Sequence, residues 1–124
     1  MADKINPVIW FEIPVTDMPR GQAFYEAVFG FKLEVVDSGE RQMAMFPMEM
    51  NTIGAGGALV KGKENVPSHT GTIVYFAVPD ITATLTKIAA HNGKTLVPKT
   101  DIGQYGFFGL FEDSEGNCIG LHSM

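Results

Sequence analysis

The hydrophobic residues of this chain gather in short runs that recur at a fixed interval. One apolar run covers residues 9–17 and a second covers residues 72–80, and each ends in an aspartate. A shift of 63 positions superimposes four residue pairs: Val15 with Val78, Asp17 with Asp80, Gly30 with Gly93, and Leu33 with Leu96. Since these matches fall where predicted elements begin and end, they indicate two copies of one supersecondary unit.

A helical pattern follows each apolar run. Residues 18–29 and 81–91 carry apolar side chains at helical spacing. The aspartate that ends each run is a good N-cap, because its side chain can accept hydrogen bonds from the free amides of a first helical turn. Gly30 and Gly93 follow the two patterns and favour the left-handed conformation that closes many helices. The sequence therefore predicts one helix in each half.

Strand-like segments fill the remainder of each half. The polar stretch 113–116 predicts a tight turn between two antiparallel strands, and residues 62–71 have the composition of a linker. The predicted strands after the helices are residues 32–36, 42–46 and 56–60, then 95–97, 106–112 and 117–121. Each half thus has the order βαβββ in an α+β fold. The single domain 1–124 divides into module 1 (about 5–61), a linker (about 62–71) and module 2 (about 72–124).

Composition and charge narrow the function classes. With 124 residues, 45% of them hydrophobic, the chain can bury the core of one domain. A net charge of −5 argues against a nucleic-acid partner, because phosphate binding needs clustered Lys and Arg. No apolar run reaches membrane length and no signal-peptide pattern opens the chain, so we expect no membrane partner and a cytoplasmic location. The one cysteine, Cys118, cannot form an internal disulfide, which agrees with a reducing compartment.

Glu12 is the first candidate for chemistry. It interrupts an apolar run, on the strand face where we expect a cavity, and a carboxylate that loses hydration is costly unless a partner satisfies it. It is a candidate general base or holder of a cationic ligand; alternatively, it hydrogen-bonds to a neighbouring strand and only fixes register. Tyr75 takes the equivalent place in the second half, so we expect it to face Glu12 and donate a hydrogen bond to the ligand.

Aromatic residues predict an apolar pocket beside these two. Trp10 lies two residues before Glu12 and so shares its strand face. The polar, glycine-flanked stretch 98–106 predicts a mobile loop over the cavity mouth, with Tyr105 in it and Phe108 shortly after. Ordinary core packing is the alternative for the phenylalanine. The same two interpretations, pocket lining or core filling, apply to four clustered methionines: Met43, Met45, Met48 and Met50.

The chain resembles the vicinal oxygen chelate superfamily, which includes glyoxalase I, extradiol dioxygenases, and bleomycin and fosfomycin resistance proteins. The resemblance spans essentially the whole chain. Its motifs are WFEIPVTD at 10–17, FYE at 24–26, VFGF at 28–31, VPD at 78–80 and FEDSEGN at 111–117. It implies an incomplete β barrel of two βαβββ modules around an open cavity. It also implies a homodimer, since members commonly pair modules between chains.

The resemblance also bears on metal. Metal-using members take His, Glu or Gln ligands from the first and last strands of each module. The matching positions here are Trp10, Ile73, Gly120 and either Ala58 or Leu59, and none of these side chains coordinates a divalent ion. We therefore expect neither metal nor other cofactor. Glu12 and His122 each lie two residues after one of these positions, and a displaced site that uses them is an alternative, although it would have only two ligands. His122 is also a candidate contact for the ligand.

Three functions follow. The first is a metal-independent, lyase- or isomerase-like enzyme of unknown substrate that uses Glu12 as base and Tyr75 as donor. The second is a protein that binds or sequesters a small molecule, as bleomycin-resistance members do. The third is a metal-dependent lyase or dioxygenase with displaced ligands. The sequence favours the first function. The missing metal ligands argue against the glyoxalase reaction itself, because that reaction relies on a metal to polarise an enediolate.

Overall fold

The computed structural model describes residues 6–124 of the chain. The predicted start of module 1, at residue 5, lies outside these residues. The elements of the first half are β1 (Trp10–Pro14), α1 (Met18–Phe29), β2 (Glu34–Asp37), β3 (Gln42–Met45) and β4 (Gly56–Lys61). Those of the second half are β5 (Tyr75–Ala77), α2 (Ile81–Ala90), β6 (Lys94–Asp101), the short 3-10 helix η1 (Gly103–Tyr105), β7 (Phe107–Glu112) and β8 (Cys118–Ser123).

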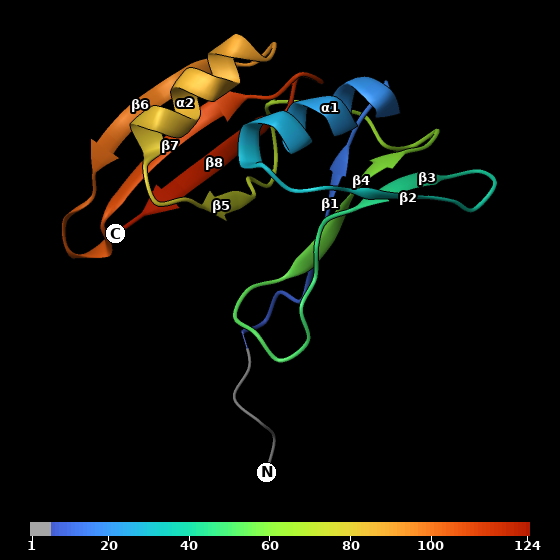
Figure 1. Ribbon diagram of the computed structural model, residues 1–124, viewed down its shortest axis with the longest axis horizontal. Coiled ribbons are helices and arrows are strands. Elements are labelled where there is room, and N and C mark those ends of the chain that lie inside the picture. Colours follow the sequence, from blue (N-terminus) through green and yellow to red (C-terminus); the bar gives the residue numbers. More distant parts are fainter. Residues whose placement is uncertain (1–5) are drawn as a thin grey trace.

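Each half forms a four-stranded sheet with a helix packed on one face. The strand orders are β1-β4-β3-β2 and β5-β8-β7-β6, and the first and last strands of each half are parallel. Figure 1 shows α1 and α2 on the same side of the two sheets, with the other sheet faces open. The predicted α+β fold of two βαβββ modules is confirmed, and no closed barrel forms among residues 6–124.

The helix boundaries follow the predicted caps closely, with one difference. Asp17 and Asp80 each accept a hydrogen bond from a backbone amide of the first turn, and Gly30 closes α1 with φ 77°. At the end of α2, Asn92 takes the left-handed conformation (φ 74°) in place of Gly93. Gly93 is needed for space instead, since a Cβ there would lie 2.6 Å from Ile88 and 2.7 Å from a backbone oxygen.

The first part of the stretch 98–106, predicted as a mobile loop, is a strand. Residues 98–101 belong to β6, which pairs antiparallel with β7. The polar, glycine-flanked composition of this stretch predicted a loop, and Pro98 within it cannot donate to a sheet. The pairing shifts register twice along β6, and these irregularities accommodate the proline. Only residues 102–106 remain as a short connection, with η1 inside it.

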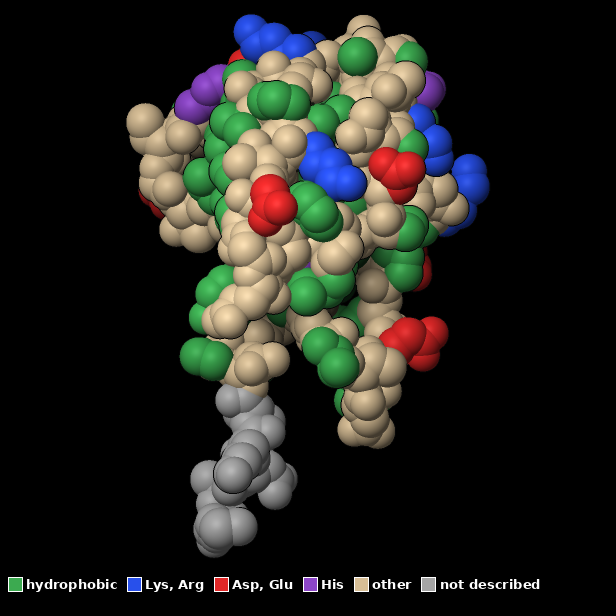
Figure 2. Space-filling model, turned by 90° about the vertical axis from the view of Figure 1, so that its left-hand side faces the viewer, with side chains coloured by type: hydrophobic (Ala, Val, Ile, Leu, Met, Phe, Trp, Pro, Cys, Tyr) green, Lys and Arg blue, Asp and Glu red, His purple; other side chains and the backbone are tan. Residues whose placement is uncertain are grey.

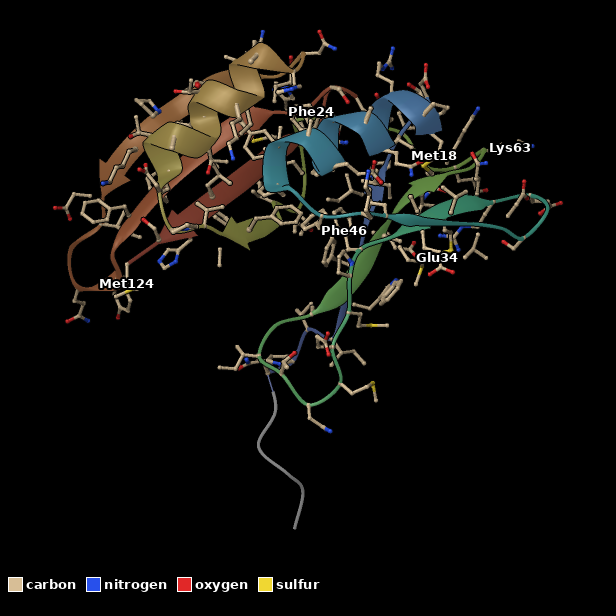
Figure 3. The ribbon with its side chains drawn as sticks, in the orientation of Figure 1. Met18, Phe24, Glu34, Phe46, Lys63 and Met124 are labelled. Atoms are coloured by element: carbon tan, nitrogen blue, oxygen red, sulfur yellow. The ribbon has the colours of Figure 1, made fainter. Side chains whose placement is uncertain are left out.

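The core lies between the helices and the sheets and joins the two modules. Tyr25 of α1 is completely buried and packs against Phe46 of module 1 and Phe76 of module 2. Figure 3 shows Phe46 beneath α1, on the side of the strands. Phe111 of module 2, also fully buried, contacts Phe24 of α1. These shared aromatic contacts hold the two modules together.

A polar turn fastens module 2 to module 1. The turn 113–117, between β7 and β8, reaches the junction of β1 and α1. There the Tyr25 hydroxyl donates to Asp113 (2.7 Å), and the Asn117 amide donates to the Pro14 carbonyl (2.8 Å). The sequence predicted this turn but not its contacts with module 1.

Glu115 is the centre of that junction, and its side chain is completely buried. Its carboxylate accepts from the backbone amides of Thr16 and Asp17, each at 2.9 Å, and from Arg20 Nε at 2.6 Å. Burial opposes the charged form, but the hydrogen bonds from Arg20 and from these amides outweigh it and lower the pKa of Glu115 to about 2.

Candidate functional site

A cavity of about 720 Å³ opens where β1 of module 1 approaches β5 of module 2. Aromatic and aliphatic side chains from both modules form most of its wall. The cavity residues from module 1 are Val8, Trp10, Phe11, Glu12, Phe31, Phe46, Pro47, Gly54 and Ala55, and those from the second half are Thr72, Ile73, Val74, Tyr75, Phe76 and Ala77. Such a concave, mainly apolar surface with few polar groups is typical of a site for a small organic molecule.

Small residues on the neighbouring strands make room for the larger side chains of this wall. Trp10 lies opposite Gly56, and Tyr75 lies opposite Gly120. A Cβ at Gly120 would overlap the Tyr75 ring, so the glycine allows the ring to lie over its strand. The position that resembles a metal-ligand position therefore serves to seat an aromatic side chain.

Glu12 lies in the cavity wall, and its carboxylate has two side-chain partners. Its side chain is 33% exposed, and Arg41 Nη2 lies 2.7 Å from its Oε1. The indole N–H of Trp10 donates to Oε2 at 3.2 Å. The carboxylate therefore has the side-chain partners that a group in an apolar wall requires, and both sequence-based interpretations of Glu12 remain predictions. Sequence reasoning missed Arg41, because it lies 29 residues away and no local pattern identifies the contact.

Tyr75 lies in the same cavity wall as Glu12, on the equivalent strand of the other module. Its side chain is half-exposed, and its hydroxyl has no hydrogen-bond partner among the described residues. The phenol is thus accessible to a ligand. The roles predicted for Glu12 and Tyr75 remain predictions.

The other predicted ligand contacts form a second, neighbouring cavity of about 490 Å³. Tyr105, Phe108 and His122 line it together with Ile102 and Tyr75. A ring nitrogen of His122, Nε2, lies 2.6 Å from the Tyr105 carbonyl oxygen and fixes the connection after β6. Phe108 was expected in the same wall as Trp10, but the structure divides the predicted set between two cavities, and Tyr75 alone belongs to both.

The four clustered methionines belong to neither cavity. Met43 and Met45 are half-buried on β3, and Met48 and Met50 are exposed in the following loop. None of the four lines either cavity. Neither pocket lining nor core filling describes the two exposed ones.

The residues at the expected metal positions do not fit a divalent ion. Ala58 is a buried apolar residue opposite Glu12, and Ile73 contributes only a hydrocarbon side chain to the cavity. Within residues 6–124, no three His, Cys, Asp or Glu side chains lie together as a metal site requires. Glu12 and His122 have other partners, Arg41 and the Tyr105 carbonyl. The displaced-ligand alternative therefore has no supporting cluster.

Comparison with known proteins agrees with this architecture. The family model described as the Glyoxalase/Bleomycin resistance protein/Dioxygenase superfamily matches residues 5–121. CFP32 of Mycobacterium bovis, whose name provisionally assigns it to the glyoxylases, is 32% identical over 117 residues. That alignment covers 94% of this chain but 43% of CFP32, so the chain spans less than half the length of this relative.

Two solved structures share the fold at low identity. Glyoxalase I from Zea mays has a TM-score of 0.71 at 18% identity, covering 99% of this chain and 48% of the maize chain. TnmS3, an antibiotic binding protein from Streptomyces sp. CB03234, has a TM-score of 0.66 at 21% identity, covering 98% of each chain. Together with the family match over residues 5–121, the two βαβββ modules show that the chain belongs to the glyoxalase/bleomycin resistance protein/dioxygenase superfamily.

Proposed function

We propose that this domain binds a small organic molecule in the cavity between β1 and β5 and does not convert it chemically. The observation that carries this proposal is the state of Glu12. Its Oε1 lies 2.7 Å from Arg41 Nη2, so the carboxylate already has an ion-pair partner outside the cavity lining, and this structural role explains its place without catalysis. The sequence alone favoured a metal-independent enzyme, and this contact reverses the preference. An antibiotic-binding protein of similar fold and length, TnmS3, gives further support.

Trp10 provides a direct test, because it is the one tryptophan of the chain and lies in the cavity wall. Screening a library of aromatic small molecules by thermal shift and by Trp10 emission should yield compounds that change both signals. Tyr75→Ala should weaken their binding about tenfold or more, as expected from loss of an aromatic contact. Tyr105→Ala, a matched change in the neighbouring cavity, should leave it nearly unchanged. Because Tyr75 lines both cavities, hits whose binding Tyr105→Ala weakens as much as Tyr75→Ala does would contradict the proposal.

Metal-independent catalysis is the second candidate, because Glu12 and Tyr75 line one cavity. In that case Glu12 Oε2, which accepts only the long bond from Trp10, is the oxygen available as base. Each compound found by screening should be incubated with the protein and its products analysed by mass spectrometry. Turnover that Glu12→Gln abolishes would establish the enzyme. Unchanged compound in every incubation supports a binding protein.

We also propose a homodimer that uses the loop after β3. In module 2 the equivalent turn, 113–117, packs on the β1–α1 junction, whereas the loop 46–55 extends away from the body, beside the N-terminal strand (Figure 1). Its Ile53 is 97% exposed, and Met50 nearby is also exposed. Figure 2 shows hydrophobic side chains on both projections below the body. A second copy of this chain would cover them.

Light scattering at tens of micromolar should then give twice the chain mass of 13.5 kDa. Ile53→Asp should shift the protein toward monomer, because it places a charge where an apolar contact forms. Val66→Asp, a matched change in the exposed linker, should remain dimeric. A monomeric wild-type protein would refute the dimer.

The remaining partner assignments stay predictions. Within residues 6–124, neither helix is long and apolar enough to cross a membrane. The cytoplasmic location and the lack of a nucleic-acid partner still rest on composition and charge.

A further inference from the structure

The charge on the side chains that line the cavity is of one sign, negative. Among the residues that line the 720 Å³ cavity, all of them in the described part of the chain, Glu12 is the one charged side chain, and Lys, Arg and His are absent. Thr72 and Tyr75 are the other polar side chains of the lining. A negatively charged ligand would therefore meet a carboxylate and no cation inside this cavity, which is unfavourable in a mainly apolar site.

Arg41 offsets part of this negative charge through its ion pair with Glu12, but it does so from outside the cavity wall. Arg41 is not part of the cavity lining and instead borders a separate surface depression with Glu40, Lys63 and Glu64. Its Nη2 contacts Oε1. Oε2 contacts Trp10, which is a residue of the cavity wall. Since each carboxylate oxygen has about two lone-pair sites, Oε2 can accept a further hydrogen bond from inside the cavity.

Aromatic side chains share the cavity wall with this carboxylate, and the Trp10 indole contacts it directly. Trp10 and Tyr75 are both partly exposed in the wall, and an indole or phenol face attracts a cation. Deeper in the same wall lie Phe31, Phe46 and Phe76, which offer an apolar surface. The cavity thus combines one acceptor site for a positive group with an aromatic site for a hydrocarbon group.

We propose that the ligand is an aromatic or otherwise apolar molecule that carries one positively charged nitrogen. The ammonium group donates to Glu12 Oε2 beside Trp10 and Tyr75, and the apolar part packs against the phenylalanines. This inference rests on the proposed binding function and names its ligand class. Neutral analogues bind more weakly, and anionic analogues bind most weakly.

Three probes that share one ring system test the inference: 2-naphthylmethylamine, 2-naphthylmethanol and 2-naphthylacetate. Isothermal titration calorimetry near pH 7 should show the amine binding about tenfold more tightly than the alcohol, as expected for a charge-assisted hydrogen bond. The acetate should bind less tightly than the alcohol. Glu12→Gln should remove the advantage of the amine and leave the alcohol nearly unchanged.

Two further variants serve as controls. Glu34→Gln, which removes an exposed carboxylate from β2 of the same module, should preserve the order of the three probes. Arg41→Gln should preserve it as well, and the amine should bind at least as tightly once the competing guanidinium is gone. If the acetate binds as tightly as the amine, the inference is wrong although a binding function stands. If no probe binds at millimolar concentration, the proposed cavity fails and the inference fails with it.

Discussion

Glu115 and Glu12 are carboxylates in the same fold with opposite surroundings. Glu115 is fully buried at the junction of the modules, and Arg20 and two backbone amides of module 1 donate to it. Glu12 lies in a cavity wall, one-third exposed, with one arginine and one indole as partners. The comparison indicates that the acidic residue of the turn contributes to stability, whereas the one in the cavity wall keeps part of its surface accessible.

Removing the charge of Glu115 should have the largest effect. Glu115→Gln loses charge-assisted hydrogen bonds in a buried site, so we expect the free energy of unfolding to fall by about 2–3 kcal/mol. Urea titration followed by circular dichroism measures this change. A loss below about 0.5 kcal/mol, the range of ordinary surface substitutions, would show that the junction contributes little.

Acid should weaken the same junction without any mutation. The pKa of Glu115 in the folded protein is about 2, below its ordinary value of 4.5. A lowered pKa stabilises the folded state above the unfolded pKa, and this contribution is lost as the pH falls from about 4.5 toward 2. Urea midpoints measured across this range should fall in the wild type and fall less in Glu115→Gln. Parallel curves for the two proteins would contradict the assignment.

Tyr25→Phe should have an intermediate effect. It removes the 2.7 Å hydrogen bond to Asp113 and keeps the ring, while Asp113 still accepts from Asn117. We expect a loss of about 1–1.5 kcal/mol in the free energy of unfolding. Phe24→Leu is the comparison variant, because it removes aromatic ring contacts but no hydrogen bond. A Tyr25→Phe protein as stable as the wild type would mean that this hydrogen bond does not help to hold the modules together.

Glu12→Gln should have the smallest effect on stability. Its ion pair with Arg41 is partly exposed, and such pairs contribute about 0–1 kcal/mol. The same variant should nevertheless change ligand binding, as described for the amine probe. A Glu12→Gln protein that unfolds as readily as Glu115→Gln would remove the contrast between the two carboxylates.

The sequence predicted those features of the fold that depend on neighbours along the chain. Asp17, Asp80 and Gly30 marked the helix ends, because caps are local interactions. The internal repeat predicted that Glu12 and Tyr75 occupy equivalent strands. The extent of β6 was missed, since its pairing with β7 accommodates Pro98 through register shifts that no local pattern reveals.

The candidate site was predictable only in part, for the same reason. Strand alternation placed Trp10 and Glu12 on one face. The contact with Arg41 joins side chains 29 residues apart, from β1 and from the turn before β3, and the division into two cavities depends on how the modules pack. Both are long-range properties, and they decide whether Glu12 is a free carboxylate or a paired one.

The central claim is that the cavity between β1 and β5 is a ligand site. Titration of isotopically labelled protein with 2-naphthylmethylamine, followed by amide chemical shifts in solution, tests it most directly. The account predicts that the largest changes fall on residues 10–12 and 72–77. Changes concentrated on residues 102–108 and 122, or spread evenly over the surface, would contradict it.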